Sequence, residues 1–454
     1  MAKLFGSSGV RGLVNVDLTP ALACKVGLAT ASYAKVRKAL VARDTRVSGS
    51  MLEEALVSGL LAGGVDVALI GVVPTPVLAY LTMALKADVG LMITASHNPP
   101  MYNGIKIFDG DSLSYTDESQ NMVEKIIAEA SFALAEWRSV GEASNADVSD
   151  LYVEMVTKAV ALHRQWRVVV DAGCGATFAI APAVLRAVGC KVTALNAQPD
   201  GFFPARSPEP TAESLKDLAQ VVKALGADVG VAFDGDGDRV AFIDEKGGFV
   251  DFDRALAAFS AYAVKKNGGG VVITNVEASM CVERMVEAQG GKVVRTRVGD
   301  VYVSEAIRRI DAVFGGEPCG AWIHPRFHYC PDGLLSAVLF LKALEEEEKT
   351  ACEFVAEVPE YVTLRENIPC RNDLKRKVVA NIEKTIRSAF PAYTGFSTVD
   401  GVRLALENGR LLIRASGTEP LIRVTVEGES LKVANAIMEK GKALVKKHIE
   451  DDEK

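Results

Sequence analysis

The chain has 454 residues, 49% of them hydrophobic and 24% charged, an ordinary balance for a globular protein. Its 51 Lys and Arg against 58 Asp and Glu give a net charge of −7, which excludes a general attraction to nucleic acid or to an anionic membrane. Because the net charge is negative, any phosphate that the protein binds must be held by local positive charge. The length predicts about three or four domains.

The cysteine pattern and the apolar runs indicate where such a protein works. Eight cysteines are scattered without a C-x-x-C pair, at positions 24, 174, 190, 281, 319, 330, 352 and 370. This spacing is typical of reduced thiols rather than of a disulfide framework or a zinc site. Residues 1–6 lack the apolar core of a signal peptide, and no apolar run approaches the roughly 18 residues of a membrane helix. We expect a cytoplasmic protein with no membrane partner.

Short apolar runs that alternate with helix-like stretches predict the fold class. Four of these runs each lead into a polar loop: residues 91–93, 168–170, 231–233 and 271–273. Buried strands alternating with helices indicate α/β units with largely parallel sheets. In such sheets, ligands bind at the loops beyond the carboxyl ends of the strands.

An internal repeat indicates duplicated domains. The segment A-L-K-A-D-V-G at 84–90 recurs 140 residues later as A-L-G-A-D-V-G at 224–230, and this offset places Ser96 opposite Asp236. Residues 310–317 have the same rhythm of helix, strand and loop with weaker identity. Chance is the alternative, because Ala, Val and Gly are common, but the matching context favours duplication. Three similar domains would each bring one loop to a shared cleft.

Changes in composition give the expected boundaries. Residues 139–150 form a polar stretch that suits a linker, and another break falls near 248–255. Glu345 to Lys349 is a charge run typical of a solvated helix face. Residues beyond 355 have a different pattern, with alternating strands around 402–427 and a final helix. We predict α/β domains at 1–148, 149–250 and 251–354, followed by a smaller α+β domain at 355–454.

The loop Thr94-Ala95-Ser96-His97-Asn98-Pro99-Pro100 follows a predicted buried strand. The two prolines hold the segment extended, so Ser96 projects into a cleft where small Ala95 leaves room for a substrate. A plain turn is an equally good interpretation of this string alone. A serine hydrolase is a poorer one, since no G-x-S-x-G elbow is present and His97 is too close in sequence to serve as the base.

The loop Asp234-Gly235-Asp236-Gly237-Asp238-Arg239 is the strongest chemical signal. Three carboxylates on alternate residues repel one another unless a cation lies between them, so a purely structural turn is a minor alternative. A calcium EF-hand is another alternative. It is disfavoured because Arg239 occupies the position where an EF-hand loop needs glycine, and because a predicted strand precedes the aspartate loop. A small octahedral ion such as Mg²⁺ fits these carboxylates.

Other loops are suited to phosphate or sugar. Arg414-Ala415-Ser416-Gly417-Thr418-Glu419-Pro420, with Arg423 beyond, offers hydroxyls, backbone N–H groups and arginines to a phosphate dianion. The stretches at 6–12 and 43–46 contain similar residues and are weak signals alone. Residues 315–320, G-G-E-P-C-G, form a glycine-rich turn whose one carboxylate, Glu317, can accept hydrogen bonds from sugar hydroxyls.

Taken together and in order, these stretches resemble the α-D-phosphohexomutase superfamily over nearly the whole chain. The motifs are T-A-S-H-N-P-P-x-Y-N-G-I-K, D-G-D-G-D-R, G-E-P-C-G and R-A-S-G-T-E-P. The resemblance implies three similar mixed-sheet α/β domains and a smaller C-terminal α+β domain around a central cleft. It also implies that Ser96 carries a covalent phosphate and that one Mg²⁺ per chain is held by Asp234, Asp236, Asp238 and a phosphoserine oxygen.

The resemblance assigns the remaining residues by their motifs. Arg11 and Lys106 would stabilise the transferring phosphoryl group, with Lys106 a candidate for proton transfer and His97 beside the serine. The sugar would be contacted by Arg239, Asp300, Glu317 and Cys319. The phosphate that is not reacting would be held by Arg414, Ser416, Gly417, Thr418 and Arg423.

The mechanism implied is phosphoryl transfer from Ser96 to a hexose or hexosamine phosphate, giving a bisphosphate that turns over and returns its other phosphate. A hexose bisphosphate is the expected activator. Thr296 to Asp300 resembles the V-G-D loop of phosphoglucosamine mutases, and a carboxylate at Asp300 suits a cationic 2-amino group. Cys319 and Ala321 replace the frequent serine and histidine of the sugar loop.

Three functions therefore stay open at this point. Phosphoglucosamine mutase of the archaeal type is the favoured one, and a glucose or mannose phosphate mutase is the alternative within the same reaction class. A non-catalytic sugar-phosphate-binding protein is the alternative of another class, disfavoured by the intact Ser96, Lys106 and aspartates. The sequence leaves the oligomeric state open between monomer and homodimer.

Overall fold

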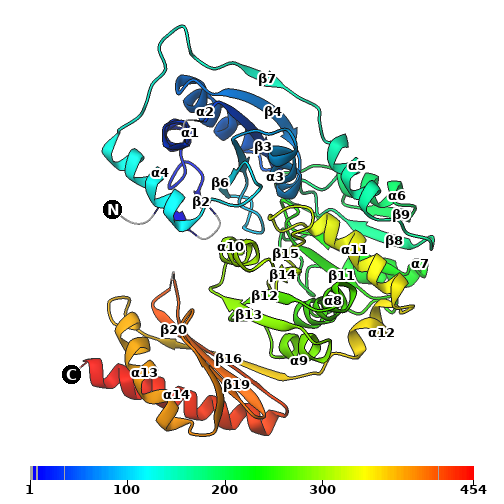
Figure 1. The fold of residues 1–454 in the computed structure, drawn as a ribbon, viewed down its shortest axis with the longest axis vertical. Coiled ribbons are helices and arrows are strands. Elements are labelled where there is room, and N and C mark those ends of the chain that lie inside the picture. The colour runs from blue at the N-terminus through cyan, green and yellow to red at the C-terminus, as the bar shows by residue number, and fades with distance from the viewer. Residues whose placement is uncertain (1–3, 7–8, 35, 418, 454) are drawn as a thin grey trace.

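The computed structural model describes residues 4–6, 9–34, 36–417 and 419–453. Three α/β domains and a smaller C-terminal domain follow one another in an arc from the N-terminus, in blue, to the C-terminus, in red (Figure 1). The predicted fold class is thereby confirmed.

The first domain is built on a seven-stranded sheet of order β1-β2-β6-β5-β3-β4-β7. Its strands are β1 (Phe5–Gly6), β2 (Gly9–Leu13), β3 (Lys38–Arg43), β4 (Asp66–Val72), β5 (Val89–Ile93), β6 (Tyr102–Asp109) and β7 (Ala143–Asn145). Its helices are α1 (Pro20–Ala34), α2 (Gly49–Ala62), α3 (Thr75–Ala84) and α4 (Asp117–Glu129). Strand β5 is buried along its whole length, as its continuous apolar sequence predicts.

The second and third domains each contain a four-stranded sheet, of order β11-β10-β8-β9 and β13-β12-β14-β15. The second comprises α5 (Asp150–Ala159), β8 (Arg167–Asp171), α6 (Ile180–Ala187), β9 (Lys191–Leu195), α7 (Lys216–Leu225), β10 (Val229–Phe233) and β11 (Val240–Ile243). The third comprises α8 (Phe252–Asn267), β12 (Val271–Asn275), α9 (Cys281–Ala288), β13 (Lys292–Thr296), α10 (Asp300–Ile310), β14 (Phe314–Gly316), β15 (Trp322–Ile323), α11 (Gly333–Glu346) and α12 (Ala351–Ala356).

The three sheets share one arrangement, as the repeat predicts. Each contains a run of at least three parallel strands, and an antiparallel strand lies beside the last strand of that run: β6 beside β5, β11 beside β10 and β15 beside β14. Strands β5 and β10 begin at residues 89 and 229, which keeps the offset of 140. The turns between these paired strands carry the serine loop, the aspartate loop and the Glu317 loop.

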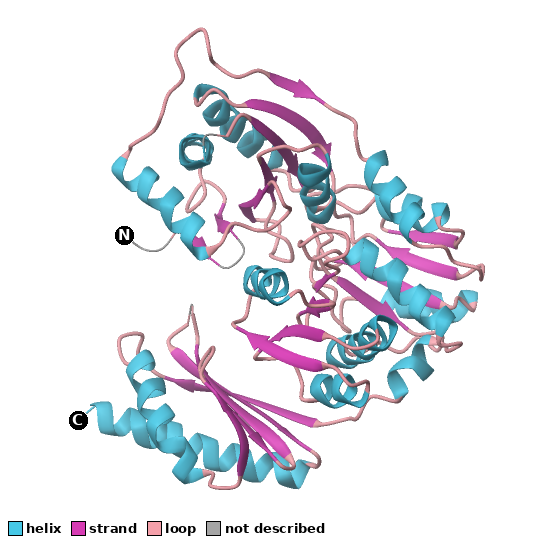
Figure 2. Ribbon diagram, in the orientation of Figure 1, coloured by secondary structure: helices cyan, strands magenta, loops and turns pink. Residues whose placement is uncertain are grey.

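The C-terminal domain is an antiparallel five-stranded sheet of order β16-β20-β19-β18-β17 with helices on one side (Figure 2). Its elements are β16 (Val362–Pro369), α13 (Lys375–Ala389), β17 (Tyr393–Ser397), β18 (Val402–Leu406), β19 (Gly409–Ala415), β20 (Leu421–Gly428) and α14 (Leu431–Glu453). This is the α+β composition that the sequence predicts.

The hydrophobic cores show how the domains are joined. One cluster of buried side chains runs through all three α/β domains, from Leu40 through Val168 to Val272. The C-terminal domain has a separate core, which includes Val378 and Ile413. Burial of apolar area therefore holds the first three domains together, whereas the fourth domain does not share their core.

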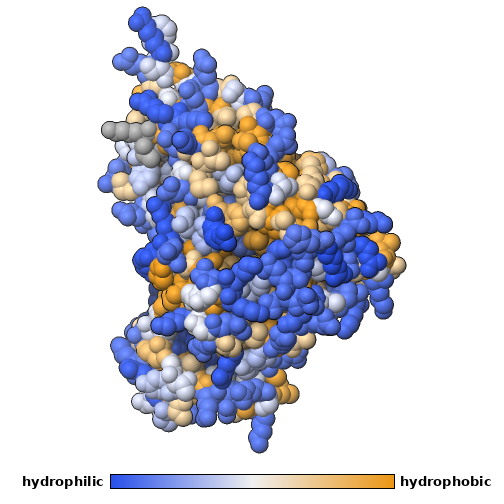
Figure 3. All heavy atoms as spheres, turned by 45° about the vertical axis from the view of Figure 1, so that its right-hand side comes forward, coloured by the Kyte–Doolittle hydropathy of each residue, from blue (hydrophilic) through white to orange (hydrophobic). Residues whose placement is uncertain are grey.

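Hydrophilic residues cover much of the face drawn in Figure 3, with hydrophobic residues gathered toward its middle. Within the described ranges, no helix has the length and apolar character needed to cross a membrane. All eight cysteines are free.

Candidate active site

Ser96 lies in the turn after β5 and has an unusual backbone conformation. Its φ is +52°, in the left-handed region that L-residues rarely adopt. The side chain is buried, and Oγ donates a hydrogen bond of 2.6 Å to Asp234 Oδ2. The Ser96 N–H donates to Thr94 Oγ1 at 2.8 Å. Surrounding contacts thus hold a strained serine in one position, facing the aspartate loop.

Arg46 supplies most of that support. Its guanidinium, which is 1% exposed, pairs with Asp44 at 3.0 Å. It also donates to four backbone carbonyls of the serine loop, those of residues 96, 98, 99 and 102, at 2.6–2.9 Å. The sequence marked residues 43–46 only as a weak phosphate signal, whereas the structure places this arginine beneath the serine loop as its anchor.

Glycine at position 235 lets the serine and aspartate loops meet. A Cβ on Gly235 would lie 2.5 Å from the carbonyl oxygen of Ser96, closer than any real side chain tolerates. Thr75, the first residue of α3, hydrogen-bonds Asp236 through both its backbone N–H and its hydroxyl. The first two domains are therefore locked together at the site itself.

Asp234, Asp236 and Asp238 form a buried cluster that can hold a metal ion. Their nearest carboxylate oxygens all lie within 4.8 Å of one another. Oδ1 of Asp236 and Oδ1 of Asp238 are buried and, among the described residues, have no hydrogen-bond partner. Unpartnered buried carboxylate oxygens are costly unless a cation meets them, so the donor set fits a hard divalent ion.

Lys106 from β6 carries the positive charge of this cluster. Its Nζ lies 2.8 Å from Asp236 Oδ2 and 2.5 Å from Asp238 Oδ2. Burial opposes its charged form, but the two aspartates outweigh burial and raise the pKa of Lys106. Burial likewise opposes the charge of Asp236, yet Lys106 holds the pKa of that carboxyl below its usual range. Burial and the two neighbouring carboxylates raise the pKa of Asp234.

Further cationic groups surround the serine. Arg11 donates to Asn98 Oδ1 at 2.9 Å, and Arg239 donates its backbone N–H to Asp234 Oδ1 at 3.1 Å. His97 Nδ1 is 3.3 Å from Ser96 Oγ. Burial, together with the charges of Arg239 and Arg11, lowers the pKa of His97 to about 2, so its imidazole is neutral.

Glu209 is a site residue that the sequence reasoning missed. Its Oε1 accepts from Arg239 Nη1 at 2.7 Å, and its Oε2 lies 3.6 Å from His97 Nε2. It comes from the Ser207-Pro208-Glu209-Pro210 loop, whose rigid prolines were the only available signal. One carboxylate thus links two residues that flank the serine.

Asp300 and Glu317 place two more carboxylates beside this centre. Burial raises the pKa of both, with Lys106 acting against the shift at Asp300. Glu317 Oε1 accepts from Asn275 Nδ2 at 2.6 Å and from the Gly299 N–H at 2.8 Å. Burial raises the pKa of Cys319 to about 12, so its thiol stays protonated.

The predicted phosphate loop of the C-terminal domain is arranged differently. Arg414 bonds to Glu277 of the third domain and pairs with Asp400 at 2.9 Å. Arg423 is half-exposed and pairs with Glu419 at 2.8 Å. Ser416 is buried and its Oγ accepts from the Glu419 N–H, while Gly417 is exposed. Thr418 lies outside the described residues. Among the described residues, no hydrogen bond or ion pair joins this loop to Ser96 or the three aspartates.

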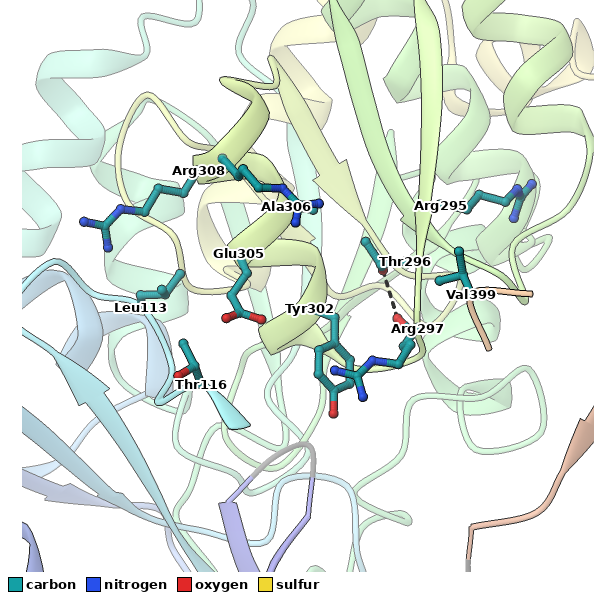
Figure 4. Close-up of a pocket in the computed structure, with 11 residues that line it drawn as sticks. Leu113, Thr116, Arg295, Thr296, Arg297, Tyr302, Glu305, Ala306, Arg308 and Val399 are labelled. Carbon is teal, nitrogen blue, oxygen red and sulfur yellow. Dashed lines mark hydrogen bonds between the residues drawn. The ribbon is translucent and has the colours of Figure 1, made fainter. Parts of the chain in front are cut away.

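A cavity of about 790 Å³ lies beside α10, the helix that begins at Asp300 (Figure 4). Its lining comes from three domains: Leu113, Thr116, Arg295, Thr296, Arg297, Tyr302, Glu305, Ala306, Arg308, Arg309 and Val399. The guanidinium of Arg297 lies 3.8 Å from the centre of the Tyr302 ring and pairs with Asp117 at 3.0 Å. None of the residues predicted for the site lines this cavity.

The structure thus brings together the serine, the three aspartates, Lys106 and the neighbouring cations. A fixed hydroxyl beside a divalent cation site and several cations is suited to accepting and donating a phosphoryl group. Two buried carboxylates at one side can accept hydrogen bonds from a polyol.

Models of the phosphoglucomutase/phosphomannomutase domains match the chain from end to end. Alpha/beta/alpha domain I matches residues 2–134, domain II 150–248 and domain III 251–361, and the C-terminal domain matches 366–441. Curated relatives include a phosphoglucosamine mutase of Methanocaldococcus jannaschii, 44% identical over 98% of this chain and 99% of its own length. Another, from Methanococcus vannielii, is 42% identical over 98% of both chains.

Solved structures show the same fold. A phosphoglucomutase/phosphomannomutase family protein of Burkholderia thailandensis is 30% identical, with a TM-score of 0.88 over 98% of this chain and 97% of its own. An N-acetylphosphoglucosamine mutase of Aspergillus fumigatus, in complex with GlcNAc-6P and magnesium, covers 98% of this chain and 95% of its own. It is only 15% identical, with a TM-score of 0.60, and shows the fold alone.

Proposed function

Since this chain belongs to the phosphoglucomutase/phosphomannomutase family of the α-D-phosphohexomutase superfamily, we propose that it interconverts glucosamine 6-phosphate and glucosamine 1-phosphate. The names of relatives 42–44% identical over nearly the full length support the substrate. The observation that carries the reaction is the 2.6 Å contact of Ser96 Oγ with the aspartate cluster. A buried hydroxyl held at a cation site is what phosphoryl transfer requires.

Asp234, Asp236 and Asp238 hold one Mg²⁺ per chain, together with a phosphate oxygen on Ser96. The two unpartnered carboxylate oxygens support this assignment, because they are buried and belong to residues of the cluster. When bound, the ion neutralises charge on the phosphoryl group. Lys106, whose ammonium pairs with Asp236 and Asp238, and Arg11 add fixed positive charge, and Lys106 is a candidate for proton transfer.

The reaction has two transfers. First, the bond between phosphorus and Ser96 Oγ breaks as the free hydroxyl of the sugar phosphate bonds to phosphorus. The proton of that hydroxyl is transferred to Ser96 Oγ, which gives a bisphosphate and a free serine hydroxyl. The bisphosphate turns over, and Ser96 Oγ attacks the other phosphate, regenerating phosphoserine and leaving the isomeric monophosphate. A hexose bisphosphate phosphorylates a serine that has lost its phosphate. Neutral His97 lies next to Oγ, where it can exchange a hydrogen bond with the serine.

The other loops bind the substrate. Glu317, Asp300, Arg239 and Cys319 contact the sugar, and Arg414, Ser416, Gly417, Thr418 and Arg423 hold the phosphate that is not reacting. Asp300 suits a 2-amino cation.

The domains span 1–148, 149–250, 251–354 and 355–454. The eight free cysteines support a cytoplasmic location. The active unit is a monomer or a homodimer.

The experiment that tests this function is kcat/KM for the 1- and 6-phosphates of glucosamine, glucose and mannose, with Mg²⁺ and a trace of the matching bisphosphate. We expect a clear preference for the glucosamine phosphates. Better turnover of glucose or mannose phosphates keeps the mechanism and replaces the substrate. No turnover of any of them by serine-phosphorylated protein favours the non-catalytic sugar-phosphate-binding role.

A further inference from the structure

The carboxylate of Glu317 is oriented by hydrogen bonds that reach only one of its oxygens. Asn275 Nδ2 donates to Oε1 at 2.6 Å, and the Gly299 N–H donates to the same atom at 2.8 Å. Within the part of the chain that the structure describes, no hydrogen bond reaches Oε2. One oxygen is therefore occupied by the protein, and the other is left to accept from a ligand.

Asn275, the last residue of β12, is itself fixed. Its Oδ1 accepts from the N–H groups of Glu277 at 2.8 Å and Ala278 at 3.1 Å. Because two backbone donors point at this atom, it must be the amide oxygen, and Nδ2 must face Glu317. Arg295 Nη1 donates to the carbonyl of Asn275 at 2.7 Å and holds the backbone as well.

Both side chains are buried, Asn275 to 2% exposure and Glu317 to 7%. Burial and the charge of Asp300 raise the pKa of Glu317, whereas Asn275, the Gly299 N–H and Arg239 favour its ionised form. In a buried position, the loss of a donor to a carboxylate costs more than the loss of an ordinary surface hydrogen bond.

We propose that Asn275 is a positioning residue for sugar recognition, which holds Glu317 so that Oε2 alone faces the sugar hydroxyls. This inference rests on the proposed function, in which Glu317 binds the sugar. The sugar must be bound in two orientations, because each phosphate reacts in turn. A carboxylate with one fixed free oxygen accepts from a hydroxyl in either orientation without rearranging, so no binding energy is lost in reordering it.

Asn275→Asp tests this role while keeping the local turn. Asp Oδ1 still accepts from Glu277 and Ala278, but an acceptor replaces the donor that faces Glu317. We expect the dissociation constant for glucosamine 6-phosphate, measured by calorimetry with Mg²⁺ at pH 8, to rise about 10- to 100-fold. KM should rise with it. At lower pH part of the loss should recover, because one of the two paired carboxyls takes up a proton and restores the hydrogen bond.

A double-mutant cycle separates positioning from a general structural role. If Asn275 acts through Glu317, Asn275→Ala should weaken binding in the wild-type background and change it by less than about 2-fold in Glu317→Ala, which leaves no acceptor for Asn275. The matched control is Asn196→Ala in the second domain. Asn196 Nδ2 likewise donates to a carboxylate oxygen of Asp171 that also accepts a glycine N–H, that of Gly173. This control should lower the melting temperature and leave sugar-phosphate affinity unchanged.

The outcomes are distinct. Unchanged affinity in Asn275→Asp, or additive effects of Asn275→Ala and Glu317→Ala, overturns the positioning role. If the wild type binds glucosamine 6-phosphate without isomerising it, the proposed function fails while the binding data still decide this inference. If the wild type does not bind the sugar phosphate, both are overturned.

Discussion

The transfer centre and the C-terminal phosphate loop are both predicted to handle phosphate, yet they are built in opposite ways. At the centre, Ser96, Asp234 and Lys106 are at most 4% exposed and already within hydrogen-bond distance of a member of the cluster. In the loop, Arg423 is half-exposed and Arg414 is engaged by carboxylates. The transfer centre is therefore assembled before substrate arrives. The arginines of the C-terminal loop would have to leave their carboxylate partners before they could bind phosphate.

The attachment of the domains explains this difference. The first three share one hydrophobic core, which fixes the serine loop against the aspartate loop. The fourth domain has its own core and meets the third through polar contacts, in which buried Arg410 donates to the carbonyls of Val276 and Glu277. Polar interfaces between domains permit relative motion more readily than apolar ones. The proposed chemistry therefore lies in the part held by a shared core, and the proposed phosphate loop lies in the part held by polar contacts.

The largest expected effect comes from the centre. Ser96→Ala removes the hydroxyl proposed to carry the phosphoryl group, and we expect mutase turnover to fall to background, at least about 10⁴-fold. The measurements are turnover of glucosamine 6-phosphate and the intact mass of the protein after incubation with a hexose bisphosphate. The phosphate mass shift should disappear with the activity.

Ser32→Ala on α1 is the matched control, because Ser32 Oγ only donates to the carbonyl of Leu28, at 2.7 Å, and accepts from the Ala133 N–H. It should keep both the turnover and the mass shift. Near-normal turnover in Ser96→Ala would show that Ser96 does not carry the phosphoryl group in the reaction.

Metal dependence probes the same rigid region. Asp238→Asn removes one charge from the cluster, and we expect kcat to fall by roughly 100-fold or more, since a bound ion contributes several kcal/mol to phosphoryl transfer. Addition of Mg²⁺ should raise the melting temperature of the wild type but not of this variant. Asp244→Asn, which alters an aspartate in the turn after β11 that bonds only to nearby backbone N–H groups, should respond to Mg²⁺ like the wild type. The same response in both variants would contradict the site.

A substitution in the C-terminal phosphate loop should weaken substrate binding more than it slows the chemical step. Arg414→Ala removes a guanidinium proposed to bind the distal phosphate, so KM should rise about 10- to 100-fold with a smaller change in kcat. Arg403→Ala is the control, because Arg403 also joins the fourth domain to the third, through Glu283 at 3.4 Å, but lies outside the loop. Equal effects of both variants on KM would show that domain attachment, not phosphate binding, is being measured.

The sequence predicted the two regions unequally, for physical reasons. Strands and their loops follow from local apolar runs, so Ser96 and the aspartates could be placed from residues close to them in the chain. Arg46 lies 50 residues before Ser96, whose carbonyl accepts its hydrogen bond. Glu209 lies 30 residues before Arg239 and far along the chain from His97, and it contacts both. No local pattern encodes such contacts. The pairing of Arg414 with Glu277, 137 residues away, was hidden for the same reason.

The interface beneath the fourth domain gives a pH-dependent prediction. Burial raises the pKa of Asp253 from 3.8 to about 6, and the Ser279 N–H donates to its Oδ1 at 2.6 Å. The folded state binds this proton more tightly than the unfolded chain. Stability from protonated Asp253 is therefore present below about pH 4 and is lost as pH rises to 6.

Asp253→Asn keeps the acceptor for Ser279 without a charge. We expect it to raise the free energy of unfolding at pH 7.5 by roughly 1–2 kcal/mol, less than the full shift would give because Asp253 is partly exposed. The gain should vanish at pH 4, as followed by urea denaturation at both pH values. A gain of equal size at both would contradict the titration of Asp253.

The smallest expected effect tests whether a carboxylate competes with the substrate. Glu277 bonds to Arg414, the guanidinium proposed to grip phosphate, and its side chain is 39% exposed. Glu277→Gln keeps its shape and removes its charge, so the incoming phosphate displaces a weaker partner. Because a partly exposed ion pair contributes about 0.2–1 kcal/mol, KM should fall by roughly 2- to 5-fold with kcat little changed. A rise in KM would mean that Glu277 positions Arg414 for phosphate instead of competing with it, and that the C-terminal phosphate loop is as preorganised as the transfer centre.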